Sequence, residues 1–192
     1  MNVWRSTTCA LAIIGLASVT TARAATITFE TVPEGACTPG SITEGGITAS
    51  FATAAGQFCV LDIVDLVGDP SLNTAPFSGH GVFNTVAGTL APLEVSFDTV
   101  LSDVSLAFGF AASGQSLLLE TFLTGTAVGG NTFSTVPNAA GFFSGIASLS
   151  GASFDRIVLT GSTNFGIDNI NVTPTAIPEP TSLLLLGTGA AG

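Results

Sequence analysis

The stretch LEVSFDTVLSDVSLAFGF, residues 93–110, decides the fold class. In residues 93–98, Leu, Val and Phe alternate with Glu, Ser and Asp, and in residues 104–110 Val, Leu and Phe alternate with Ser, Ala and Gly. Strict alternation of apolar and polar residues is typical of a half-buried β-strand. The short polar break between the two runs predicts a hairpin of antiparallel strands.

Similar apolar runs lie on both sides of this stretch, separated by turn-forming residues. The candidate strands are residues 26–30, 47–53, 58–66, 81–86, 116–124, 132–136, 142–146, 154–161 and 165–172. Gly-Asp-Pro-Ser at 68–71, Gly-Gly-Asn at 129–131 and Gly161-Ser162 supply turns at short intervals. We therefore expect residues 25–174 to form one all-β domain, an antiparallel β-sandwich of two sheets.

The composition excludes several classes of protein. The 192 residues are 46% hydrophobic and only 8% charged, with 3 Lys and Arg against 13 Asp and Glu. A nucleic-acid binder needs a basic face to replace phosphate counterions, and this chain contains no Lys. Disorder needs low hydrophobicity, and collagen needs a strict glycine period. None of these three classes fits.

The N-terminal segment, residues 1–24, has the pattern of a secretory signal peptide. Arg5 precedes an apolar stretch at residues 9–19, and Ala-Arg-Ala at 22–24 forms a small-x-small cleavage motif. A membrane anchor is the alternative, but the stretch is about 11 residues where a span needs roughly 20. We expect cleavage between Ala24 and Ala25, and hence export.

Two cysteines, Cys37 and Cys59, remain after cleavage, an even pair that predicts a disulfide in an exported chain. Closing a loop of about 22 positions is worth on the order of 3 kcal/mol. Metal binding by the pair is the alternative, but no His or third Cys lies nearby to complete a metal shell. Cleavage also leaves Arg156 as the one Arg against 13 acidic residues, so the exported surface is strongly acidic.

The C-terminus contains Pro178-Glu179-Pro180 followed by an apolar run, LLLLGTGAAG, at 183–192. Residues 175–192 resemble the PEP-CTERM sorting signal of Gram-negative, exopolysaccharide-producing bacteria. The resemblance implies processing by an exosortase-type membrane enzyme, transient inner-membrane anchoring by the tail, and a place at the cell surface or in the extracellular biofilm matrix. The family pattern also has a terminal Arg cluster, which is missing here, so the signal reads as truncated.

The last candidate strand contains an irregularity. Phe165 and Ile167 lie on one face, whereas Ile170 and Val172 have the opposite parity, so the apolar phase slips across residues 168–169. A slip inside an apolar strand predicts a β-bulge.

The two closing runs, FDRIVL at 154–159 and FGIDNINV at 165–172, resemble the end of galactose-binding-like jelly rolls. The resemblance implies a jelly-roll-like sandwich and a structural calcium ion held by Glu30 in the first strand and Asp168 in the last. The alternative is that the Asp168 carboxylate satisfies neighbouring backbone groups at the bulge. No other cofactor is expected.

Catalysis has little support in the sequence. His80 is the only histidine, and no nucleophile-elbow pattern surrounds a serine. Several carboxylates could form a glycosidase pair, but they fit turns or solvent-facing strand positions better: Asp62, Asp65, Asp69, Glu94, Asp98 and Glu120. We therefore expect no catalytic residues and a non-catalytic surface or matrix protein that associates with polysaccharide. A secreted carbohydrate-active enzyme is the alternative.

Overall fold

The computed structural model describes residues 23–37, 40–53, 58–62, 77, 79–85, 91–137 and 142–176. The strands are β1 (Ala25–Ile27), β2 (Ser41–Glu44), β3 (Ile47–Thr53), β4 (Phe58–Asp62), β5 (His80–Asn84), β6 (Leu93–Phe110), β7 (Ser116–Leu123), β8 (Thr126–Ser134), β9 (Val136–Pro137), β10 (Phe143–Gly161) and β11 (Gly166–Pro174). The described residues contain no helix, and therefore none that could cross a membrane.

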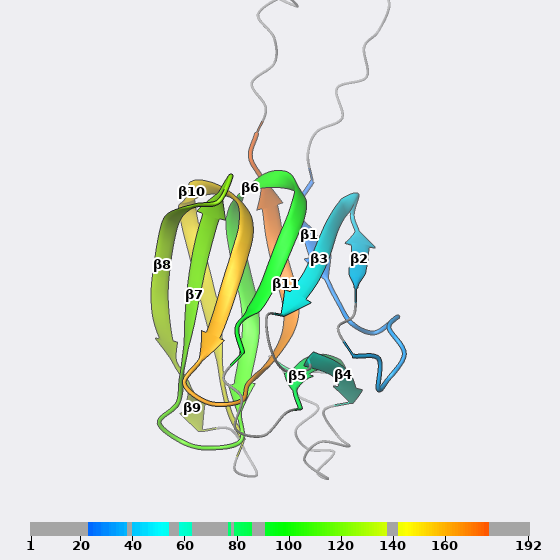
Figure 1. Ribbon diagram of the computed structural model, residues 1–192, viewed down its shortest axis with the longest axis vertical. Coiled ribbons are helices and arrows are strands. Elements are labelled where there is room, and N and C mark those ends of the chain that lie inside the picture. The colour runs from blue at the N-terminus through cyan, green and yellow to red at the C-terminus, as the bar shows by residue number, and fades with distance from the viewer. Residues whose placement is uncertain are drawn as a thin grey trace, which may run out of the picture.

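Two long strands, β6 and β10, run through both layers of a sandwich (Figure 1). Residues 93–97 of β6 pair with β3, and residues 93–96 pair with the second half of β10. The second half of β6 pairs with β11 and with residues 143–150 of β10. One layer is therefore β2-β3-β6-β10-β7-β8, and the other is β4-β5-β11-β6-β10-β9, with β1 beside β11. All pairings are antiparallel, which confirms the predicted all-β, jelly-roll-like sandwich of two sheets.

The predicted hairpin within residues 93–110 is wrong. Its two runs do not pair with each other; they belong to one strand that bends from one layer into the other. The connecting residues 99–103, TVLSD, contain no glycine, proline or asparagine to form a tight turn. Leu101, in their middle, is fully buried, so the connection is held against the core.

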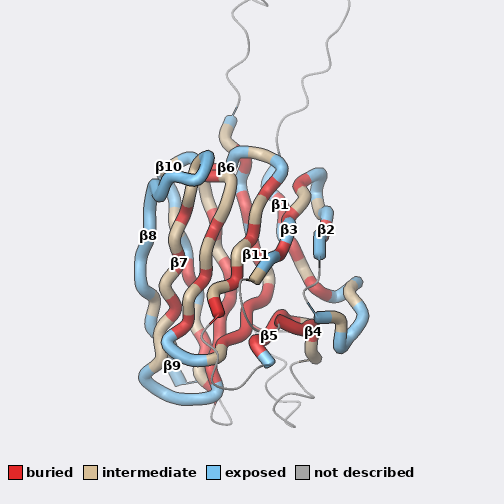
Figure 2. The backbone as a smooth tube through the Cα atoms, in the orientation of Figure 1, coloured by how far each residue is buried: buried red, intermediate tan, exposed pale blue. Residues whose placement is uncertain are grey.

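Burial follows the alternation along the strands (Figure 2). The main core between the layers is rich in Phe, and its largest fully buried members include Phe29, Phe58, Phe108, Phe110 and Phe154. A smaller cluster of Phe77, Phe83, Ala107 and Phe142 packs separately from it. The two clusters explain how a sandwich of this size can bury rings on both sides of a strand such as β6.

The predicted disulfide between Cys37 and Cys59 is confirmed, with an S–S distance of 2.00 Å. It fastens residues 35–37 along the outer edge of β4. The Gly35 amide donates to the Val60 carbonyl at 2.8 Å, and the Val60 amide donates to the Ala36 carbonyl at 2.9 Å. The disulfide therefore closes this edge of the sheet as well as a loop.

Both ends of the described domain lie at one end of the sandwich (Figure 1). Ala25, which begins β1, pairs with Val172 near the end of β11. The signal peptide up to residue 22 and the motif Pro178-Glu179-Pro180 lie outside the described residues, so both stay predictions.

Candidate functional site

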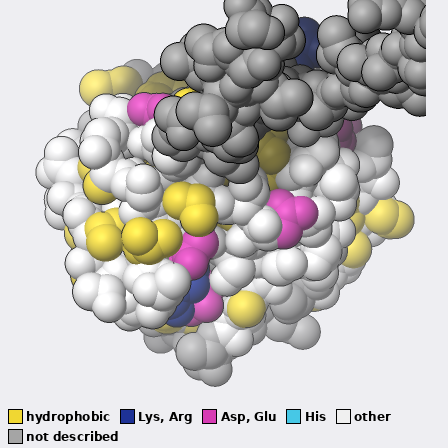
Figure 3. All heavy atoms as spheres, turned by 90° about the horizontal axis from the view of Figure 1, so that it is seen from above, with side chains coloured by type: hydrophobic (Ala, Val, Ile, Leu, Met, Phe, Trp, Pro, Cys, Tyr) yellow, Lys and Arg dark blue, Asp and Glu magenta, His cyan; other side chains and the backbone are white. Residues whose placement is uncertain are grey.

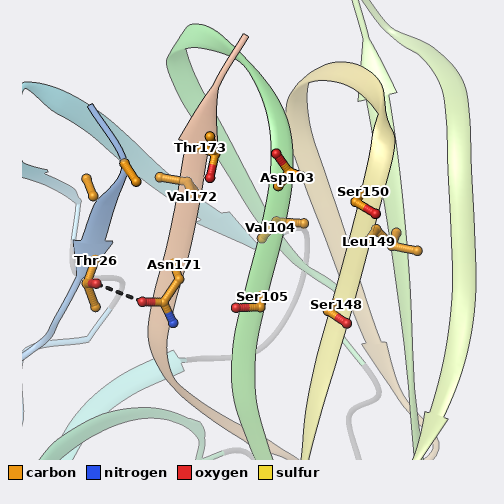
Figure 4. A pocket seen from close by; sticks show the side chains of 12 residues that line it. Thr26, Asp103, Val104, Ser105, Ser148, Leu149, Ser150, Asn171, Val172 and Thr173 are labelled. Carbon is orange, nitrogen blue, oxygen red and sulfur yellow. Dashed lines mark hydrogen bonds between the residues drawn. The ribbon is translucent and has the colours of Figure 1, made fainter. Parts of the chain in front are cut away.

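The outer face of the layer built on β1, β11, β6 and β10 carries a set of polar side chains that we call the hydroxyl face (Figure 4). The face consists of Thr26, Asp103, Ser105, Ser148, Ser150, Asn171 and Thr173. These positions alternate with residues of the main core, such as Val104 and Val172. Because successive side chains of a strand point to opposite faces, burying those apolar neighbours turns the polar ones outward.

The strand register aligns the hydroxyl face in two rows. In the first row Thr26 pairs with Asn171, Asn171 with Ser105, and Ser105 with Ser148. In the second row Thr173 pairs with Asp103, and Asp103 with Ser150. Each row crosses neighbouring strands about 4.8 Å apart. The rows therefore form a straight polar track across the sheet.

Hydrogen bonds fix part of the track. The Thr26 hydroxyl donates to Oδ1 of Asn171 at 2.7 Å, and Nδ2 of Asn171 donates to the Asn169 carbonyl at 3.1 Å. The Ser102 hydroxyl donates to Oδ2 of Asp103 at 2.6 Å. The amide of Asn171 and the carboxylate of Asp103 are thus held in position before any ligand arrives.

Four hydroxyls of the track, those of Ser105, Ser148, Ser150 and Thr173, make no hydrogen bond within the described part of the chain. They line a groove of about 350 Å³ together with the other side chains of the face. The groove can therefore exchange hydrogen bonds with a polyhydroxylated ligand without breaking bonds that hold the fold.

A second hollow, the end pocket, lies where β5 and β6 end and β11 begins. Its volume is about 420 Å³, and it is lined by the rings of Phe83, Phe110 and Phe142 and by the amides of Asn84 and Asn164, among others. Its described lining contains no carboxylate and no histidine. Among the described residues, the end pocket thus offers an apolar floor with amide groups.

The predicted β-bulge is confirmed at residues 168–169. The register of β11 against β6 shifts between Asp168 and Asn171, and Asn169 has a φ of 50°. The shift brings Ile167 and Ile170 into the same core despite their opposite parity. Asp168 is buried, and both its oxygens accept hydrogen bonds from Asn169, as the alternative to calcium supposes.

The hydrogen bonds of Asp168 bear on only part of the calcium site that the sequence predicts from Glu30 and Asp168. First and last strands are neighbours, as expected, but Glu30 lies beyond β1 and its Oε1 accepts the His80 backbone N–H at 3.2 Å. Within the described residues no group of three or more His, Cys, Asp or Glu gathers as metal ligands. A calcium ion would need backbone carbonyls to complete these two carboxylates, so the site stays a prediction.

The other titratable candidates lie at separate places on the strands. Oδ1 of Asp98 accepts the Thr48 amide at 3.0 Å, and Asp62 pairs across the sheet with His80. Asp65 and Asp69 lie outside the described residues. Glu94 and Glu120 both pair with Val158 from opposite sides, so an entire strand separates them.

Arg156 forms an ion pair with Glu94. Its Nη1 lies 2.9 Å from Oε2 of Glu94, and its guanidinium carbon lies 4.5 Å from the centre of the Phe122 ring. The view from above shows little charge overall, with basic atoms set among acidic side chains (Figure 3). The Glu94 carboxylate is therefore engaged in an ion pair.

Sequence reasoning missed the hydroxyl face as a unit. Each of its serines and threonines was visible as the polar partner in an alternating strand, but nothing in the sequence indicated which strands are neighbours. The lateral register, which creates the rows, depends on pairings between residues as far apart as Thr26 and Asn171.

No family model matches the chain, and no curated protein matches it. Solved structures that it resembles include the K2 cleaved adhesin domain of Lys-gingipain, with a TM-score of 0.49, 15% identity, and coverage of 79% of this chain and 98% of that one. A family 6 carbohydrate-binding module follows at a TM-score of 0.41 and 15% identity, covering 65% and 87%. A family 32 module from C. perfringens NanJ in complex with galactose has a TM-score of 0.37 and 17% identity, covering 66% and 93%. At these levels the likeness assigns neither a family nor a ligand to this chain.

Proposed function

We propose that this is an exported, non-catalytic protein of the cell surface or extracellular matrix, which associates with exopolysaccharide through the hydroxyl face. The observation that carries the proposal is the double row of hydroxyl, amide and carboxylate groups across neighbouring strands, lining an open groove. An extended polymer needs a track rather than a closed pocket, and a row that crosses several strands is such a track.

The chemistry of the track matches that of a sugar chain. The hydroxyls of Ser105, Ser148 and Ser150 can donate and accept, the Asn171 amide can do both, and the Asp103 carboxylate accepts. A sugar hydroxyl can likewise donate and accept, so each contact can be satisfied in either direction. Prior positioning of Asn171 and Asp103 lowers the entropy that binding costs.

We propose in addition that the groove binds polysaccharide without hydrolysing it. Glycoside hydrolysis generally requires two carboxylates flanking the bond that is cleaved. The described lining of the groove contains one, Asp103. With a single carboxylate, the groove is suited to holding a polysaccharide and not to cleaving it.

Export and sorting complete the proposal. The signal peptide would leave Ala25 as the first residue, which is also the first residue of β1. A disulfide between Cys37 and Cys59 is typical of proteins that fold in an oxidising compartment. The exosortase-type enzyme would act at Pro178-Glu179-Pro180 once a longer apolar segment and a terminal Arg cluster follow the motif. With such a tail restored, a Glu179→Ala variant should keep its tail and lose its surface location in an exosortase-containing host.

The test of binding is retention on the producer's own exopolysaccharide, with release of reducing ends assayed in parallel. A Ser148→Ala/Asn171→Ala variant should lose about tenfold in affinity, because each hydrogen bond is worth about 0.5–1.5 kcal/mol. Ser50→Ala, on the outer face of the other layer, is the matched control and should be retained like wild type.

Equal retention of wild type and the double variant would show that the hydroxyl face is not the binding surface. Release of reducing ends by the wild-type protein would establish instead the carbohydrate-active enzyme that the sequence left as the alternative.

A further inference from the structure

The rim strand β8 is long, uncharged and unpaired on one side. Its nine residues, TAVGGNTFS, contain no Asp, Glu, Lys, Arg or Pro, and all except Phe133 are exposed (Figure 2). It pairs with β7, and no other described strand pairs with it. An edge of this kind is a template for pairing with another chain, which natural sheets normally avoid.

The other described edges of the sandwich are protected. The outer edge of β4 is covered by residues 35–37, which the disulfide fastens there. The strand β9 has two residues, of which Pro137 has no N–H to donate, and β2 has four residues and ends in Glu44. Short length, proline, charge and covering segments are the usual devices against edge pairing. Among the described edges, β8 alone is long and free of proline and charge, and its one irregularity is the register shift against β7 between Gly129 and Ala127.

The backbone of β8 has a specific blocking contact. The Thr132 amide donates to Oδ1 of Asn131 at 2.8 Å, so this N–H is not used in pairing with β7. Because backbone amides alternate between the two sides of a strand, that of Gly130 points to the same edge, whereas the Ser134 backbone lies close to Gly145 of β10. The Asn131 side chain therefore covers one amide of an edge that is otherwise ready to pair.

We propose that β8 pairs antiparallel with β8 of a second copy of this chain, about a two-fold axis at Gly130. This register sets Gly130 against Gly130 and Gly129 against Asn131, next to Val128, which the register shift against β7 leaves without a partner on that strand. No side chain lies on the axis, and every pair across it is uncharged. The interface uses the same strand of both copies, as a two-fold dimer requires.

Charge favours this edge over other surfaces for self-association. The chain has a formal net charge of −10, so most of its surface repels a second copy. The carboxylate beside the axis is Glu120, which pairs with Gly130 from β7. In the dimer two such carboxylates lie three strand spacings apart, about 14 Å. That exceeds the screening length of about 8 Å at physiological ionic strength.

The experiment measures the mass of the exported protein by sedimentation over a concentration series, at low and at physiological salt. The wild-type protein should shift from monomer to dimer with concentration, at a lower midpoint when salt is higher. Thr132→Pro removes an N–H that β7 does not use, and should remain monomeric with unchanged thermal unfolding.

Two further variants test the register. Gly130→Lys sets two lysines against each other across the axis and places each beside Glu120 of its own β7, so the fold is kept and the dimer is lost. Ala112→Lys adds the same charge in the exposed turn after β6 and should dimerise at least as well as wild type. Asn131→Ala uncovers the Thr132 amide and should lower the midpoint concentration several-fold.

A wild-type protein that stays monomeric at every concentration and salt would overturn the proposal. So would a folded Thr132→Pro or Gly130→Lys variant that dimerises like wild type, because the contact would then lie elsewhere.

Discussion

The backbone N–H of Asn169 donates to Oδ1 of Asp168 at 2.7 Å, and the side-chain amide of Asn169 donates to Oδ2 of the same carboxylate at 2.8 Å. Asn169 has a φ of 50°, which asparagine tolerates far better than β-branched residues do. These two residues therefore hold the bulge that keeps both halves of β11 in the core.

Replacing Asn169 by valine should lower the free energy of unfolding by about 2 kcal/mol, from left-handed backbone strain and loss of the side-chain hydrogen bond. Asn169→Gly, which keeps the backbone conformation, should cost clearly less. Denaturant unfolding of both variants measures the difference. Equal losses would mean that strain at this residue contributes nothing.

A structural calcium ion at Glu30 and Asp168 predicts that the melting temperature rises with calcium concentration and falls with chelator, since a ligand that binds only the native state stabilises it. Asp168→Asn should abolish that response. A wild-type melting temperature that is insensitive to calcium would contradict the calcium site.

Reduction of the Cys37–Cys59 disulfide should cost on the order of 3 kcal/mol, because the unfolded chain regains the freedom of a loop of about 22 residues. Unfolding of Cys37→Ser/Cys59→Ser measures it, with intact mass before and after alkylation as the check on pairing. Freely alkylated thiols in the exported protein would contradict the disulfide. Since the bond also fastens residues 35–37 to β4, its loss should speed amide exchange at Val60 more than at residues of β7.

Arg156 should stabilise the fold through both Glu94 and Phe122. The Arg156 and Glu94 side chains are 27% and 39% exposed, so solvent screens their ion pair and it is worth less than 1 kcal/mol. The contact with the Phe122 ring adds about 0.5–1 kcal/mol. Thermal unfolding should therefore show a larger loss for Arg156→Ala than for Glu94→Gln, which keeps the ring contact. Equal losses would assign the whole effect to the ion pair.

The alternating pattern predicted strand type well and strand connection poorly. Ile47–Thr53 was predicted with its observed bounds, and the bulge followed from apolar parity within one strand. The polar break at 99–103 predicts a turn, whereas those residues stay extended and cross between the layers. Likewise residues 142–146 and 154–161 are predicted as separate strands, but from residue 143 onward both belong to β10.

The turn predicted from the glycines of β8 is wrong. Gly-Gly-Asn at 129–131 predicts a turn but lies within the strand, while the turn itself is Thr124-Gly125, where both residues have positive φ. Local chemistry marks where a chain can turn, and tertiary pairing with β7 decides where it does. The hydroxyl face depends still more on pairing between distant strands, which no local pattern contains.

The position of β11 also determines when the domain can fold. The last strand of the sandwich lies inside its layer, with β6 on one side and β5 and β1 on the other. Ala25 therefore has no partner strand until residue 172 has been made, and most pairings join residues far apart in the chain. Such topologies fold slowly, because long loops must close before their contacts form. A chain emerging from N- to C-terminus therefore stays without its sandwich until almost the whole domain has been delivered.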